Sequence, residues 1–179
     1  MEDRFVEENV RHRLILSGIA ELEERGIADF SLRRAAIGAQ VSCAAPYRHF
    51  KSKEEYINEI ILYVGSKWEL LSKEICAIFA DDPASLVREI CIANLRFRIA
   101  NRNFPLALAH TRESGKTIDE SIDAAVLNYC KARGLSESET ELKCFTALTL
   151  IYGAVSMLDD ENTDEILNLM EKKLKEEFK

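Results

Sequence analysis

The sequence has few of the residues that interrupt helices. Its 179 residues include 7 glycines and 3 prolines, and 47% of the chain is hydrophobic. A long all-β sandwich or a disordered chain is therefore not expected. The chain also lacks a run of about 20 consecutive apolar residues, so no membrane span is predicted. Its length suits one compact domain, or a small module joined to a larger one.

Paired cysteines and an apolar leader are also missing. The five cysteines are odd in number and scattered, which fits a reducing compartment better than a disulfide framework. Residues 1–4 (MEDR) are largely acidic and lack the apolar core of a signal peptide. We therefore expect a cytoplasmic protein.

Residues suited to catalysis or metal binding are scarce. The only three histidines are His12, His49 and His110, and none has metal-ligand spacing with a cysteine or a carboxylate. The sequence contains neither a glycine-rich phosphate loop nor a nucleophile elbow. The sequence thus predicts no enzyme, no cofactor and no metal site.

Apolar residues at helical spacing are abundant, and they predict an all-α fold of about nine helices. A first apolar stripe runs from Val6 to Leu22, and Gly26 follows it as a stop signal. Later helices are marked by capping signals, in which a side-chain oxygen accepts a hydrogen bond from the first turn. These signals lie at Ser52, Asp82, Thr117, Ser136 and Asn162, and they predict a long helix from Ser52 and helices near 83–100, 103–112, 118–132, 137–158 and 163–178.

Residues 30–56, FSLRRAAIGAQVSCAAPYRHFKSKEEY, predict a helix-turn-helix. Two short helices, around 31–38 and 42–49, are joined by the turn 39–41. Ala36 is small where the second helix must pass closely, and Ser42 is a plausible N-cap for that helix. In such a motif the second helix presents its early side chains to a DNA major groove.

Charge is distributed unevenly along the chain. The net charge of −7 and the isoelectric point of about 5.1 argue, taken alone, against a nucleic-acid binder. However, residues 31–53 hold five basic residues and no acidic one. The net charge is −1 over residues 1–55 and −6 over residues 56–179, so the basic charge gathers where a DNA groove would lie.

The residues of this segment resemble the signature of TetR-type (tetracycline-repressor-like) bacterial regulators. The resemblance covers about the first 60 residues and is carried by Ser31-Leu32-Arg33, Ala36, Val41-Ser42, Tyr47, His49-Phe50 and Lys53-Glu54. It implies an N-terminal three-helix DNA-binding domain, residues 1–55. It also implies a larger C-terminal helical domain, residues 56–179, for effector binding and dimerisation.

The resemblance also implies roles for individual residues. Tyr47, His49 and Lys53 match positions that contact the phosphate backbone, and Arg33 matches one that contacts a phosphate or a base. On the recognition helix, Arg48 has the donor fork that can read guanine. The full set of expected DNA-binding residues is Ser31, Arg33, Ser42, Cys43, Ala44, Ala45, Tyr47, Arg48, His49 and Lys53.

Other interpretations of these residues stay open. Core packing is the alternative for Phe50 and Tyr47, and a surface position without a role is the alternative for His49. Oxidation of Cys43 could be coupled to release from DNA. Gln40 stands where the family usually has glycine, and a left-handed backbone there would cost roughly 1 kcal/mol.

The C-terminal region is expected to hold a small-molecule pocket and a dimer interface. Arg96, Arg98 or Arg102 could hold an anionic ligand, and ordinary core packing is the alternative for each apolar candidate. The candidates for the pocket are Trp68, Phe97, Phe104, His110, Tyr129 and Phe145. For dimerisation the last two helices are favoured, because a stripe near the chain end has few intrachain partners left. Its candidates are Phe145, Leu148, Tyr152, Val155, Ile166, Met170 and Leu174.

These features together predict a ligand-responsive transcriptional repressor. It would bind double-stranded DNA at a palindromic operator as a homodimer, and a small-molecule effector would release it. The alternative is a dimeric small-molecule binding or interaction protein that keeps the helix-turn-helix only as a scaffold. Activation rather than repression is a third possibility.

Overall fold

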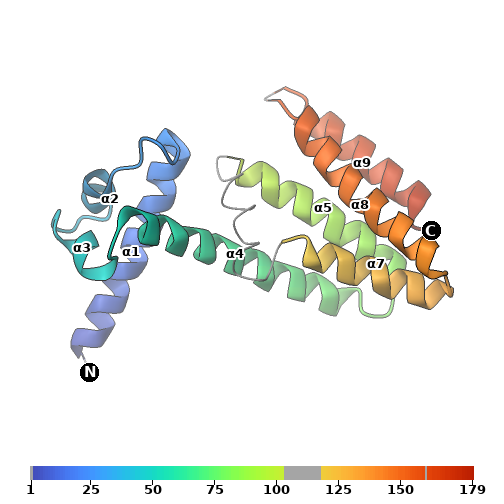
Figure 1. Ribbon diagram of the computed structural model, residues 1–179, viewed down its shortest axis with the longest axis horizontal. Coiled ribbons are helices and arrows are strands. Elements are labelled where there is room, and N and C mark those ends of the chain that lie inside the picture. The colour runs from blue at the N-terminus through green and yellow to red at the C-terminus, as the bar shows by residue number, and fades with distance from the viewer. Residues whose placement is uncertain (1, 103–117, 160) are drawn as a thin grey trace. The chain divides into compact units, whose positions relative to one another are not determined.

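The computed structural model describes residues 2–102, 118–159 and 161–179, which form helices and no β-strand (Figure 1). The all-α prediction is confirmed, and the eight helices of the described residues compare with the nine or so predicted. The helix predicted near 103–112 lies outside the described residues. The observed helices are α1 (Glu2–Arg25), α2 (Leu32–Gly38), α3 (Ala45–His49), α4 (Lys53–Ile78), α5 (Pro83–Ala100), α7 (Glu120–Arg133), α8 (Glu137–Met157) and α9 (Thr163–Glu177).

Most helix ends follow the capping signals of the sequence. The Asp82 side chain accepts the N–H of Ser85 at 3.0 Å, with Pro83 at the first position of α5. A complete capping box joins Ser136 and Glu139 at the start of α8. After α1, Gly26 takes a left-handed conformation with φ of 73°.

The capping signal at Asn162 was wrong. Asn162 precedes α9, but its side chain makes no capping hydrogen bond. The side-chain amide instead donates to Met157 O at 2.8 Å, and its oxygen accepts the N–H of Asp159 at 3.0 Å. The preceding loop therefore uses the polar groups that would have capped the helix.

The described residues divide into two compact units, of which the first reaches Ser66 and the second begins at Lys67. α4 contributes residues to both units, so this division falls inside a helix. The sequence places the boundary between the functional domains at residue 55, and that assignment of functions stays a prediction.

The first unit gathers α2, α3 and the start of α4 around α1 (Figure 1). Its core is aromatic at one end, where the rings of Phe50 and Tyr56 stack with centroids 4.1 Å apart. Gly18 allows α1 and α4 to approach closely, because a Cβ atom there would lie 2.5 Å from Ile60 Cδ1. The Tyr56 hydroxyl donates to Leu14 O across the same contact, and burial raises the pKa of this phenol.

The second unit is a bundle in which α5 packs against α7, α8 and α9 (Figure 1). Aliphatic side chains of α5 and α7 fill most of its core. The apolar stripe of α9 points into the same core and is buried there: Ile166, Met170, Leu174 and Phe178. The expectation that this stripe lacks partners within the chain was therefore wrong, because α5 supplies them.

None of the described helices combines the length and the apolar character that a bilayer crossing requires.

Candidate nucleic-acid interface

Small buried residues and a capped N-terminus set the position of α2 in the first unit. Ser31 precedes the helix, and its hydroxyl accepts the N–H of Arg34 at 3.4 Å. Ala35 and Ala36 are fully buried, as expected for a helix that passes closely against its support. Arg33, three residues before Ala36, is exposed.

The turn after α2 passes through a left-handed residue. Gln40 has φ of 56°, in the left-handed region that favours glycine. The N–H of Val41 donates to Ala36 O at 3.0 Å, and that of Gln40 to Ile37 O at 2.9 Å. This pair of bonds defines a Schellman motif, so the turn keeps the usual geometry despite its residue.

The recognition helix α3 starts later than the sequence indicates. Ser42 is not its N-cap: α3 runs from Ala45 to His49, and Ala44 precedes it. The reason is Pro46, which has no N–H to donate to the carbonyl of Ser42 four residues earlier. Instead, the N–H of Ala45 closes a tighter bond to Ser42 O at 2.9 Å, which leaves residues 42–44 as an exposed turn.

The expected contact residues separate into exposed and buried groups. Tyr47 is 69% exposed, so it does not pack in the core. Phe50 is buried, which agrees with the alternative interpretation that it packs in the core. His49 is half-buried. Ala45 is also buried, so its side chain is not presented to a partner and its expected DNA contact is wrong. The exposed candidates of the turn and of α3 are Ser42, Cys43, Ala44, Tyr47 and Arg48.

The basic residues of the segment do not all have free charges. Arg34 pairs with Glu21 of α1, and this hydrogen bond raises the pKa of the guanidinium above its ordinary value. Within the described part of the chain, no ion pair or side-chain hydrogen bond engages Arg33, Arg48 or Lys51. These three cations are therefore not neutralised by any described residue.

Lys53 begins α4, as the sequence predicts. The Ser52 hydroxyl accepts the N–H of Glu55 at 3.1 Å, while the Glu55 carboxylate accepts the N–H of Lys51 at 2.7 Å. The Lys53 ammonium lies 3.3 Å from Ala28 O. Its charge thus sits beside a helix N-terminus, where N–H groups and the helix dipole favour an anion.

The expected pocket residues are not brought together in one place. Trp68 is buried and packs at a tilt against Phe97, with ring centroids 5.4 Å apart. Tyr129 instead packs edge-on against Phe178, and Phe145 is 67% exposed. Phe104 and His110 lie outside the described residues.

Two of the three arginines suggested for an anionic ligand have acidic partners. Arg98 is turned inward, but its guanidinium pairs with Asp119 at 2.6 Å and its Nε donates to Asn94. Arg96 lies 3.6 Å from Glu171. The largely buried Arg98 charge is therefore neutralised within the protein, whereas Arg96 makes only an exposed surface pair.

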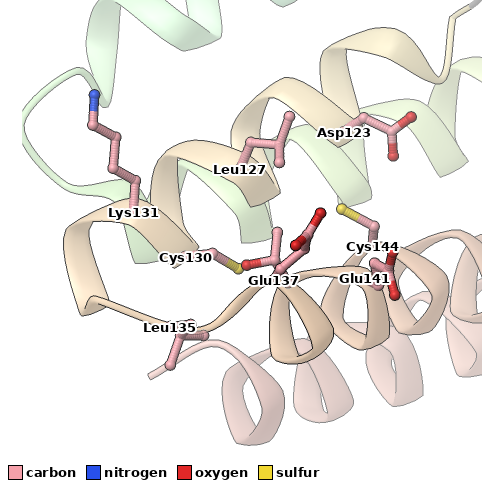
Figure 2. A pocket seen from close by; sticks show the side chains of 9 residues that line it. Asp123, Leu127, Cys130, Lys131, Leu135, Glu137, Glu141 and Cys144 are labelled. Atoms are coloured by element: carbon pink, nitrogen blue, oxygen red, sulfur yellow. The ribbon is translucent and has the colours of Figure 1, made fainter.

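A hollow that the sequence did not indicate lies between α7 and α8 (Figure 2). It has a volume of about 780 Å³, within the usual range of ligand pockets. Asp123, Glu137 and Glu141 carry its acidic groups, and burial raises the pKa of Asp123. It is detectable only in the structure, because its lining comes from two helices whose pairing the sequence does not specify.

The expected dimer residues fall on two sides of α8 and α9. Ile166, Met170 and Leu174 are buried in the core of the second unit, which leaves no surface for a partner. Tyr152 is exposed like Phe145, while Leu148 and Val155 are half-buried. A smaller apolar groove of about 230 Å³ runs between the two helices, and Gly153, Met157 and Leu169 contribute to it.

The sequence has known relatives over part of its length. Over 87 residues it is 32% identical to an Escherichia coli K12 protein named "Probable acrEF/envCD operon repressor". The match covers 49% of this chain and 40% of that protein, so the chain spans less than half of the curated relatives it matches. No protein-family model matches the chain.

Solved structures match nearly the whole chain. A TetR/AcrR-family regulator from Thermobifida fusca superposes with a TM-score of 0.71 at 18% identity, covering 92% of this chain and 95% of its own. For a TetR regulator from Haloarcula marismortui the TM-score is 0.71 at 17% identity, and the match covers 96% of this chain and 97% of that one. For RolR in complex with resorcinol the TM-score is 0.60 at 15% identity, and the match covers 95% of this chain and 89% of that one. The resemblance that the residues around the helix-turn-helix predict is thus confirmed: the chain has the fold of the TetR/AcrR family of transcriptional regulators.

Proposed function

We propose that this protein is a DNA-binding transcriptional repressor that acts as a homodimer and is released by a small molecule. One observation carries the proposal. In the acid-free segment 31–53, Arg33, Arg48 and Lys51 have no acidic partner among the described residues, and Tyr47 stands exposed beside them.

The chemistry of this face suits a phosphate backbone flanking a major groove. Lys53 and the first turn of α4 would hold one phosphate, and Tyr47 would donate to another. Arg48 has the two parallel donors that match guanine O6 and N7. The small exposed residues Cys43 and Ala44 would let the backbone of the turn approach the bases closely.

The dimer is proposed from the exposed apolar side chains of the last helices. α8 and α9 expose Phe145, Tyr152, Met157 and Leu169, and the last two of these line the small groove at Gly153. Packing this face against its two-fold copy would form a four-helix bundle and cover these side chains. Two recognition helices would then meet a palindromic operator about one helical turn apart.

A small-molecule effector is proposed for the second unit. The hollow between α7 and α8 and the aromatic pair Trp68–Phe97 are its candidate contacts. The fold's neighbour RolR is known in complex with resorcinol, a small phenol. An effector can release DNA only if it binds the DNA-bound and free states with different affinities.

Salt dependence of DNA affinity tests the proposal. We expect Tyr47→Ala and Lys53→Ala each to weaken binding to DNA from upstream of the gene. Lys53→Ala should also reduce the slope of log affinity against log salt by about one for each protomer, because a phosphate contact is lost. Lys172→Ala, which removes an exposed lysine of the second unit, is the matched control.

The same titration decides between the two classes of function. A protein that keeps the helix-turn-helix only as a scaffold would show no steep salt slope for the wild type. Unchanged affinity in the Tyr47→Ala and Lys53→Ala variants at moderate salt would show that the DNA-contact assignment is wrong.

A further inference from the structure

The turn of the helix-turn-helix carries a cost that the rest of the first unit must offset. Gln40 adopts φ of 56°, which a residue with a Cβ atom rarely adopts. The conformation matters because it sets the direction in which the chain leaves α2 and enters the turn before α3. Because glutamine disfavours a positive φ, it fixes this direction less firmly than glycine would.

A side chain from another helix reaches this turn. Arg13 of α1 donates through Nε to Ala39 O at 3.0 Å and through Nη2 to Gln40 O at 2.9 Å, with a further contact from Nη2 to Ala39 O. Both carbonyls lie beyond the last residue of α2. The guanidinium is rigid and planar, so its fork holds the two carbonyls at one spacing.

Two further residues of α1 continue this contact at helical spacing. Four residues after Arg13, the Ser17 hydroxyl donates to Ala35 O at 2.8 Å. Four residues later again, the buried Glu21 carboxylate accepts the backbone N–H of Ser31 at 3.2 Å. Arg13, Ser17 and Glu21, here called the polar seam, therefore hold the backbone of α2 at its end, middle and start.

We infer that Arg13 is a positioning residue for the recognition helix: it holds the left-handed turn at Gln40 in place of the missing glycine. Its charge acts on backbone carbonyls and not on a phosphate. Within the described residues it has no acidic partner, so the turn is its main attachment. The part of this inference that concerns DNA rests on the proposed function, while the part that concerns the turn does not.

A double-mutant cycle between Arg13 and Gln40 tests the turn directly, without DNA. Arg13→Ala should speed amide hydrogen exchange of Gln40 and Val41 by about tenfold, since their bonds to α2 depend on the turn. Gln40→Gly in the same chain should restore most of the protection, because glycine needs no support at positive φ. Arg25→Ala, at the exposed end of α1, is the control.

The outcomes of the cycle are decisive in each direction. Unchanged exchange in Arg13→Ala would overturn the inference, and so would faster exchange that Gln40→Gly fails to restore. If Arg13→Ala does not fold, Arg13→Lys replaces it. Lysine keeps the charge and the aliphatic stem but cannot fork to two carbonyls, so the same acceleration and the same rescue are expected.

DNA affinity then separates positioning from direct contact. With a duplex of about 30 base pairs, long enough for two half-sites one turn apart, Arg13→Ala should weaken binding about tenfold. The salt slope should stay that of the wild type, and Gln40→Gly should restore the affinity. A slope reduced by about one would identify Arg13 as a phosphate contact and overturn the inference. If the wild type binds no DNA, the proposed function fails while the exchange result still stands.

Discussion

The same hydrogen-bond pattern ends a helix in each unit, but the two turns are supported differently. After α7, Gly134 has φ of 66°, and Leu135 N–H donates to Cys130 O at 3.0 Å. After α2, the residue with φ of 56° is Gln40, and the side chain of Arg13 holds its carbonyl. A turn can thus be secured by its own residue or by a distant one, and in the second case it depends on tertiary packing.

The difference extends from the turns to the units around them. In the first unit, directional bonds from the polar seam hold α2, and Gly18 allows one close approach of α1 and α4. In the second unit, aliphatic side chains of four helices fill a common core. Directional contacts suit a surface that must keep one geometry, whereas an aliphatic core can repack more easily.

The largest expected effect concerns the aliphatic core. Leu174→Ala should destabilise the second unit by about 2–5 kcal/mol, because Leu174 is fully buried and its removal leaves a cavity. Leu70→Ala, at an exposed leucine of the same unit, should change stability by less than about 0.5 kcal/mol. Fluorescence of Trp68, the only tryptophan, reports on this unit during denaturant unfolding.

Equal effects of the two leucine variants would contradict the burial of the α9 stripe.

A smaller effect is expected from adding one methyl group in the first unit. Gly18→Ala would place a Cβ atom 2.5 Å from Ile60 Cδ1 and 3.0 Å from the Tyr56 hydroxyl. Overpacking costs about 1–3 kcal/mol, and the better helix propensity of alanine returns up to about 1 kcal/mol. The matched change in α8, Gly153→Ala, meets no atom within 4 Å in the protomer and should stabilise it slightly. Thermal unfolding followed by circular dichroism measures both, and a stabilised Gly18→Ala would refute the close approach.

The smallest effect comes from exchanging the residue types of the two turns. Gly134→Gln places at the end of α7 the residue type that the first unit has at Gln40. We expect a loss of about 1 kcal/mol, because no arginine among the described residues holds the carbonyls there and the left-handed backbone disfavours a Cβ atom. The added Cβ atom meets open space, so crowding does not contribute. Gly134→Asn should cost less, since asparagine tolerates this conformation better. A neutral Gly134→Gln would mean that such turns need no support.

Much of the fold followed from local patterns. α5 begins and ends where the sequence predicts, because Asp82 and Pro83 act within one turn of the helix they start. α3 begins three residues later than predicted, because Pro46 has no N–H to donate to Ser42 O. The predicted DNA-binding face remains mostly exposed, with Ala45 as the exception.

The pocket and the dimer face were less predictable. Both depend on which helices pack against which, and an apolar stripe has the same appearance in a core as in an interface. Tyr129 and the apolar stripe of α9 are buried in the same core, whereas Phe145 of α8 is exposed. The hollow between α7 and α8 forms only once these helices have packed, because its lining residues come from both of them.

The sequence by itself determined most of the helices, several of their caps and the location of the basic segment, because these depend on residues within a few positions of each other. It also placed Gln40 at a turn position where a left-handed backbone would cost roughly 1 kcal/mol. Only the tertiary structure decided that Arg13 supports that turn, that Glu21 neutralises Arg34, and that the α9 stripe belongs to the core. Each of these contacts joins residues distant in sequence, and hydrogen bonds and burial between them arise only once the helices have packed.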